Sequence, residues 1–243
     1  MTDAIPFRVF GHPRSGNHLL AYTVWRTFCP DADLSVSSLG GTGHWSGRQN
    51  GDEHYCGGTG AEAGRVRYGR ILGRRLHDFP AQGVSYTNAI YIIRDGRDVA
   101  LSLYRWTEMR HVERRQDDLE TYLRTPVDWT GTPATRRAES ADDWLVWDHW
   151  REHVQAWVAT NALMVRYENL VLRPDLVMAR VARHFGLPSP ENVQAPEPVG
   201  WNPSQQPRVQ RWKTELPPSL RQLFDQRVPS NFVGRWSPSL VKG

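Results

Sequence analysis

A strand-like run, a glycine-containing turn and a helix-like run follow one another near the start of the chain. Ile5 to Phe10 is short and largely apolar, GHPRSG follows it, and NHLLAYTVWRTF then reads as a helix. Gly11 and Gly16 have the G-x-x-x-x-G spacing of a phosphate-binding loop. Because backbone N–H groups of such a turn and a helix N-terminus point at one place, this unit predicts an anion site.

The same loop lacks the rest of a nucleoside-triphosphatase signature. Asn17 and His18 stand where a lysine and a Mg²⁺-binding Ser or Thr would be needed. We therefore expect phosphate binding without ATP hydrolysis. The alternative is a tight strand-to-helix turn whose glycines serve packing alone.

Further strands and helices alternate along the chain and set the expected fold class. Strands separated by helices indicate an α/β fold with a P-loop-like central parallel sheet flanked by helices, with the site in the loops at the strand ends. We expect one domain over 1–243, because that length is close to the usual size of a single domain. The expected strands are NAIYII, ALMVRYENL and a run around Ile71 and Leu72; the expected helices lie within 94–115, after a capping box at Ser140 and Asp143, and within 174–185 with Gly186 as C-cap.

Composition restricts the kind of partner. Lys and Arg total 30 against 26 Asp and Glu, a modest excess that favours an anionic ligand over a protein that coats nucleic acid. No apolar run approaches the roughly 18 residues of a membrane span, and the first residues lack the pattern of a signal peptide, so a cytoplasmic location is expected. Cys29 and Cys56 form neither a disulfide framework nor a zinc motif.

Two stretches are expected to be insertions. Nine of the 25 residues at 40–64 are glycine, so we expect a long mobile loop. Trp45 and Tyr55 in that loop have no obvious core to fill and are candidates to stack on an acceptor. Residues 116–137 are polar and contain two prolines, which indicates a surface insertion.

HPRSGNHLL resembles the 5′-phosphosulfate loop of the cytosolic sulfotransferases that use 3′-phosphoadenosine 5′-phosphosulfate (PAPS). YIIRDGRDVALSLYRW resembles the element of that family that holds the 3′-phosphate, with Arg94 at a strand end and Ser102 on the following helix. VRYENL resembles the strand whose tyrosine meets the adenine, here Tyr167. LHDFP resembles the segment that carries the catalytic histidine, here His77.

The resemblance implies the sulfotransferase fold, in a compact form typical of bacterial small-molecule enzymes. The implied reaction moves a sulfuryl group from PAPS to a hydroxyl or amine of a small-molecule acceptor and leaves adenosine 3′,5′-bisphosphate. It implies His77 as the general base, Asp78 as a group that orients the acceptor, and Arg75 and Arg14 as cations that stabilise the transferred charge. No metal is required for this chemistry.

Three positions depart from the family pattern. Arg14 replaces the usual loop lysine, and Leu19 stands where many members have a tryptophan on the adenine. QQPRVQRWK lacks the Arg-Lys-Gly triplet of many members, so Arg208 or Arg211 is expected to replace it on the 3′-phosphate. The full set of expected cofactor contacts is Arg14, Ser15, Gly16, Asn17, His18, Arg94, Ser102, Tyr167, Arg208 and Arg211.

Other interpretations remain open from the residues alone. His12 and His18 lie close to the loop and are rival bases, and Arg94 can also pair with Asp95 or Asp98 on a solvated turn. The chain can instead be a non-catalytic binder of adenine nucleotides or RNA, or an atypical P-loop kinase. We expect a small-molecule acceptor as partner, no nucleic acid, no membrane, and a monomer or homodimer.

Overall fold

The computed structural model describes residues 6–28, 54–55, 67–68, 79–110, 118–126, 144–193, 207–230 and 232. These residues contain a sheet of five strands in the order β2-β3-β1-β4-β5. The pairs β1–β3, β1–β4 and β4–β5 are parallel, and β2 is antiparallel to β3. The strands are β1 (Pro6–Gly11), β2 (His54–Tyr55), β3 (Arg67–Tyr68), β4 (Ala89–Ile93) and β5 (Leu163–Arg166).

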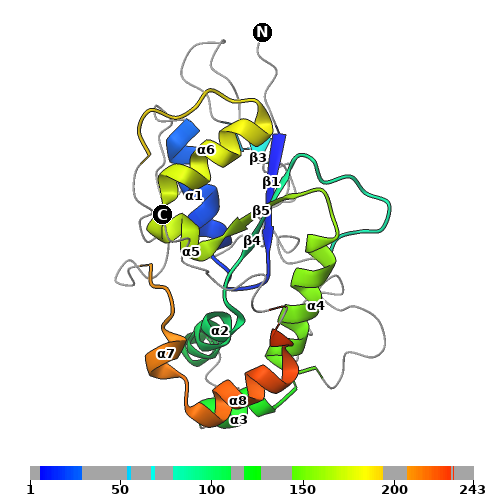
Figure 1. The fold of residues 1–243 in the computed structure, drawn as a ribbon, viewed down its shortest axis with the longest axis vertical. Helices are drawn as coiled ribbons and strands as arrows, with labels where there is room; N and C mark the ends of the chain where they lie inside the picture. The colour runs from blue at the N-terminus through cyan, green and yellow to red at the C-terminus, as the bar shows by residue number, and fades with distance from the viewer. Residues whose placement is uncertain are drawn as a thin grey trace.

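Helices cover both faces of the sheet (Figure 1). They are α1 (Asn17–Phe28), α2 (Gly96–Arg110), α3 (Leu119–Arg124), α4 (Val146–Val158), α5 (Tyr167–Leu172), α6 (Pro174–Phe185), α7 (Trp212–Glu215) and α8 (Pro218–Arg227). Helices α1, α5 and α6 gather on one side, and α4 lies on the other, while α2, α3, α7 and α8 form a group at the lower end of the view. The expected parallel sheet flanked by helices is confirmed.

Alternation along the strands produces the two faces. Successive side chains of a strand point to opposite faces, so β4, which is buried throughout, contributes to two separate cores. Ile90 and Ile92 pack with α1, α5 and α6, whereas Tyr91 and Ile93 pack with α2, α4 and α8. A continuous apolar run is therefore the sequence of a strand that is covered on both sides.

Helix α4 binds its face of the sheet through tryptophans. Trp147, Trp150 and Trp157 are buried, and their spacing places them on one face of the helix. Trp157 stacks on Tyr91 with a centroid distance of 5.1 Å. The predicted start of this helix near Ser140 is wrong, because Trp144 and Leu145 are not helical and the helix begins at Val146.

The actual start of α4 uses a different side chain. Leu145 has extended backbone, with φ −72° and ψ 165°, and its N–H donates to Asp148 Oδ2 at 3.1 Å. An acidic side chain in the first turn thus satisfies a backbone donor that the helix leaves unpaired. Ser140 and Asp143, the predicted capping box, lie outside the described residues.

Some of the remaining predicted helices and strands are confirmed, and others differ from the structure. The helix at 17–28, the strand at 89–93 and the helix at 174–185 are confirmed, and Gly186 ends the last one with φ +66°. The strand expected over ALMVRYENL is too long, since Tyr167 already begins α5. The strand expected around Ile71 and Leu72 lies outside the described residues, and the strand found in that part of the chain is β3.

Four short elements lie in segments that were expected to be irregular. Helix α3 lies inside 116–137 and is capped by Asp118, which accepts from the N–H of Thr121 at 2.7 Å. Helices α7 and α8 lie in the proline-rich tail, where Pro218 occupies the first turn of α8. His54 and Tyr55 form β2 rather than a loop, and the rest of 40–64 lies outside the described residues.

Candidate active site

The strand register places three chain segments at one edge of the sheet. Gly11 is opposite Ile92, and Ile93 is opposite Arg166, so the residues that follow β1, β4 and β5 leave the sheet side by side. Strand β1 pairs with β3 on one side and with β4 on the other, and in open α/β sheets ligands usually bind at such a change of strand order, beyond the carboxyl ends of the strands. Arg94 and Tyr167 are the first residues after β4 and β5.

The loop from Gly11 to Gly16 is compact and closed by its own hydrogen bonds. The N–H of Ser15 donates to the carbonyl oxygen of His12 at 3.0 Å, and Asn17 Nδ2 donates to the carbonyl oxygen of Gly11 at 3.2 Å. Arg14 and Gly16 have φ of +68° and +99°, a left-handed backbone that Gly16 adopts without cost. This turn leads directly into α1, which is the expected geometry of an anion-binding loop.

Arg94 is the central cation of the site and is 6% exposed. Its Nη1 donates to the carbonyl oxygen of Arg14 and its Nη2 to that of Arg208, both at 3.3 Å. The guanidinium lies 4.2 Å from the centre of the Tyr167 ring and 4.0 Å from Asp98 Oδ2. Its Nε is buried and has no hydrogen-bond partner.

Arg14 and Ser102 also meet, although 88 positions separate them. Arg14 Nε donates to Ser102 Oγ at 3.2 Å. Ser102 lies two turns into α2, so the loop after β1 and the helix after β4 converge where the family element for the 3′-phosphate is expected. Of the predicted cofactor residues, the structure brings together Arg14, Ser15, Gly16, Asn17, Arg94, Ser102, Tyr167 and Arg208.

Buried polar atoms without hydrogen bonds concentrate at this edge of the sheet. Among the described side chains they include Ser15 Oγ, Arg94 Nε and Asp98 Oδ2. Buried polar groups in folded proteins are normally hydrogen-bonded, and an unpaired one often marks the position of a ligand. The unpaired donors in the loop and on Arg94 therefore fit a ligand that carries acceptor oxygens.

Burial changes the proton affinity of several groups around Arg94. Desolvation raises the pKa of Asp98, and the charge of Arg94 and the N–H of Trp212 partly oppose that rise. Desolvation also raises the pKa of the Tyr167 hydroxyl, although Arg94 and the N–H of Arg208 lower it.

Arg97, on the first turn of α2, is held by two neighbours. It pairs with both oxygens of Asp95, at 2.9 and 2.6 Å, and its guanidinium lies 3.4 Å from the centre of the Trp212 ring.

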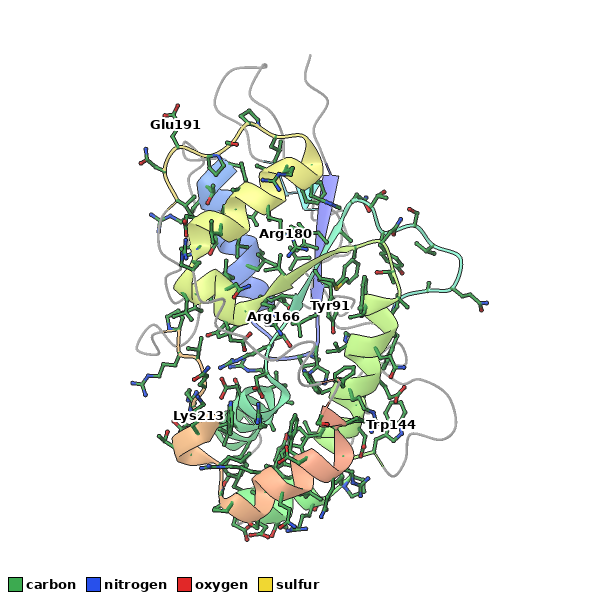
Figure 2. The ribbon with its side chains drawn as sticks, in the orientation of Figure 1. Tyr91, Trp144, Arg166, Arg180, Glu191 and Lys213 are labelled. Carbon is green, nitrogen blue, oxygen red and sulfur yellow. The ribbon has the colours of Figure 1, made fainter. Side chains whose placement is uncertain are left out.

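Three buried histidines form a second cluster beside the loop. His12 Nδ1 donates to the carbonyl oxygen of Pro13 at 2.9 Å, because a carbonyl can only accept, and His12 Nε2 is 3.0 Å from His149 Nδ1. His153 Nδ1 is 2.7 Å from the hydroxyl of Tyr91, on the α4 side of β4 (Figure 2). Sequence reasoning missed His149 and His153, although their four-residue spacing on the apolar face of α4 was a visible signal.

Phe79 packs on this histidine cluster. Its ring centre is 4.8 Å from that of His153 and 5.5 Å from that of His149. The contact matters for the site because the predicted base, His77, precedes Phe79 by two residues in the sequence.

The remaining predicted site residues either lack a described position or lie away from Arg94. Trp45, Arg75, His77 and Asp78 lie outside the described residues, and the side chain of His18 is not described. Arg211 donates to both oxygens of Glu215, at 3.1 and 2.9 Å, and Arg105 shares that carboxylate. Tyr55 lies on β2, which is separated from β1 by β3.

Comparison with known proteins agrees with this architecture. Residues 77–197 match the sequence profile of the sulfotransferase domain. This chain carries a sulfotransferase domain. Its structure is similar to the crystal structure of mouse sulfotransferase SULT7A1 complexed with PAP, with 14% sequence identity, a TM-score of 0.51, and coverage of 99% of this chain and 86% of that chain. No curated protein matches the chain.

The matched region of the sulfotransferase domain contains Arg94, Ser102 and Tyr167, and it begins at His77. The fold expected from the sequence is thereby confirmed. Within the described residues, no group of three or more His, Cys, Asp or Glu side chains is arranged to hold a metal ion, and no helix is long and apolar enough to cross a membrane.

Proposed function

We propose that this chain transfers the sulfuryl group of PAPS to a hydroxyl or amine of a small-molecule acceptor and releases adenosine 3′,5′-bisphosphate. The observation that supports this proposal most strongly is the position of Arg94. It is buried at the end of β4, has an unpaired Nε, and lies against Tyr167 and beside the loop that follows β1. Such a donor is suited to a phosphate that sits next to an aromatic base.

The described residues fit both ends of this nucleotide. The loop amides, Arg14 and Ser15 are the proposed ligands of the 5′-phosphosulfate; in support, Ser15 Oγ is buried without a hydrogen bond, and Gly16 allows Tyr167 to approach the loop closely. Arg94 and Ser102 are the proposed 3′-phosphate ligands, and Tyr167 is the proposed contact of the adenine. The bisphosphate carries more acceptor oxygens than AMP, so this site favours it.

His77 is the proposed general base. It accepts the proton of the acceptor as the new oxygen–sulfur or nitrogen–sulfur bond forms and the bond between sulfur and the bridging oxygen breaks. His12 is poorly suited to that role, because it is 0% exposed and both of its ring nitrogens contact protein groups. Arg75 and Arg14 neutralise the charge that develops on the leaving oxygen, and Asp78 orients the acceptor.

A small acceptor is proposed on the basis of Trp45 and Tyr55. Aromatic side chains beside a catalytic loop are typical of sites that bind sugars, nucleosides or phenols. Both residues come between the loop after β1 and His77 in the sequence.

Titration with nucleotides tests the proposed binding site for PAPS. Arg94→Gln removes a charge-assisted contact of about 1.5 to 3 kcal/mol, so affinity for adenosine 3′,5′-bisphosphate should fall roughly 10- to 100-fold. Affinity for AMP should change little. Arg180→Gln, an equal charge change at an exposed position on α6 (Figure 2), is the control and should leave both affinities unchanged. Equal losses for the two nucleotides in Arg94→Gln would contradict the assignment.

Turnover tests the base. Purified protein incubated with PAPS and a mixture of hydroxyl and amine compounds should yield products heavier by one sulfonate group, also in EDTA. His77→Ala should lower turnover about 100- to 10,000-fold while keeping affinity for adenosine 3′,5′-bisphosphate. The control is His184→Ala, since His184 is exposed and contacts the carbonyl oxygen of Thr87 at the opposite end of β4. Normal turnover in His77→Ala would exclude this residue as the base.

A further inference from the structure

The segment 207–212 lies against the first turn of α2, and one buried carboxylate holds it there. Asp98 is 1% exposed, and its Oδ1 accepts from the N–H of Trp212 at 2.9 Å. The backbone N–H of Gln210 lies close enough to help lower the pKa of this carboxyl group, against the rise caused by burial. Arg97, the preceding residue, lies on the face of the Trp212 ring. The neighbouring α7 and α2 are seen together in Figure 2, where Lys213 marks α7.

The same segment reaches into the proposed nucleotide site. The carbonyl oxygen of Arg208 accepts from Arg94 Nη2 at 3.3 Å, and the N–H of Arg208 lies close enough to the Tyr167 hydroxyl to lower its pKa. The backbone of Arg208 therefore lies beside both the proposed 3′-phosphate ligand and the proposed adenine contact. The position of 207–212 thus determines how both groups are presented.

The backbone of the segment is bent in an uncommon way. Gln210 has φ +58°, a left-handed conformation that residues with a side chain adopt rarely. Such a conformation persists where surrounding contacts fix it. Gln210 is flanked by the hydrogen bond from the N–H of Trp212 to Asp98 on one side and by the hydrogen bond from Arg94 to the carbonyl oxygen of Arg208 on the other.

We propose that Asp98 is a positioning residue that fastens 207–212 across the nucleotide site, and that its charge limits affinity for the 3′-phosphate. This inference rests on the proposed function, in which PAPS is the donor of the sulfuryl group. The two roles use different oxygens: Oδ1 anchors the segment, while Oδ2 has no hydrogen bond and faces Arg94 at 4.0 Å. A negative charge at that distance competes with a phosphate for the same guanidinium.

The two roles predict opposite effects of two substitutions. Asp98→Asn keeps an oxygen acceptor for the segment but removes the charge, so affinity for adenosine 3′,5′-bisphosphate should rise about threefold or more. Asp98→Ala removes the anchor as well, so that affinity should fall roughly tenfold. Affinity for AMP, which has no 3′-phosphate, should change little in Asp98→Asn, whereas in Asp98→Ala it should fall as well, because the position of the segment also affects Tyr167.

The position of the segment is measured separately, without nucleotide. Trypsin cleaves after Arg208, Arg211 and Lys213, and mass spectrometry of the fragments reports the rate at each bond. Asp98→Ala should be cut there roughly tenfold faster than the unchanged protein, since a released segment is open to the protease. Asp98→Asn and the control Asp225→Ala, an exposed position on α8, should be cut at the original rate.

The outcomes separate the two claims. Weaker bisphosphate binding in Asp98→Asn, or unchanged cleavage in a folded Asp98→Ala, would overturn the role of Asp98. If Asp98→Ala does not fold, Asp98→Asn alone decides by the direction of its affinity change. Accelerated cleavage of Asp98→Ala in a protein that binds no adenosine 3′,5′-bisphosphate would support the anchor and reject the proposed donor.

Discussion

Two glycines permit the close approaches on which the site depends. A Cβ on Gly11 would lie 2.2 Å from Asn17 Oδ1, and a Cβ on Gly16 would lie 2.5 Å from Tyr167 Cδ2. Gly16 additionally needs its positive φ to turn the loop into α1. Spacing alone identified these residues as a phosphate-loop pattern, and the structure adds that Gly16 also makes room for the proposed adenine contact.

Gly16→Ala should therefore weaken nucleotide binding beyond its effect on the backbone. The added methyl displaces the Tyr167 ring, so affinity for adenosine 3′,5′-bisphosphate should fall about tenfold or more by calorimetric titration. Gly83→Ala is the matched control, because Gly83 has φ +74° but nothing within 4 Å of an added Cβ. Both substitutions place an alanine at a positive φ and so destabilise the backbone, but only Gly16→Ala should lower the affinity for adenosine 3′,5′-bisphosphate. Similar affinities in the two variants would contradict this account.

The junction between β5 and α5 contains a buried acid that links two elements. Glu168 is 2% exposed, and its Oε1 accepts from the N–H of Asp95 at 3.0 Å, which ties the start of α5 to the turn after β4. Burial raises the pKa of Glu168 above its ordinary value of 4.5, and the N–H of Asp95 opposes part of the rise. The junction is thus more stable when this carboxyl group is protonated.

Glu168→Gln should reduce the loss of stability as pH rises. A raised pKa in the folded state means that the folded protein holds more protons than the unfolded chain above pH 4.5, so the free energy of unfolding falls with rising pH in that window. The loss is about 1.4 kcal/mol for each unit by which the pKa is raised. Glutamine keeps the acceptor for Asp95 and does not titrate, so urea unfolding from pH 4 to 8 should show a shallower decline.

The slope with pH is the decisive quantity, because any packing change in Glu168→Gln is independent of pH. Glu191→Gln, an exposed position shown in Figure 2, is the control and should keep the slope of the unchanged protein. A steeper decline in Glu168→Gln would show that Glu168 stabilises the fold in its charged form.

At the scale of the whole molecule, the segments with strong periodicity were the ones predicted well. The helix at 17–28 and the strand at 89–93 each carry a continuous local pattern, and both were confirmed. Helices α7 and α8 were missed because prolines break the pattern in the tail. Helix α8 is stabilised by Leu220 and Phe224, which pack against residues of α4 more than 60 positions earlier.

Arg94, Ser102 and Tyr167 were indicated as a set by their resemblance to the sulfotransferase family, whereas the sequence by itself determined the alternation of strands and helices and the glycine loop. These follow from local spacing, which fixes periodicity and turn chemistry. Only the tertiary structure decided that Arg94 lies on Tyr167, that His12 contacts His149, and that Asp98 holds the N–H of Trp212. Each of these contacts joins residues far apart in the chain, and it forms because strand register and the burial of two apolar faces bring them together.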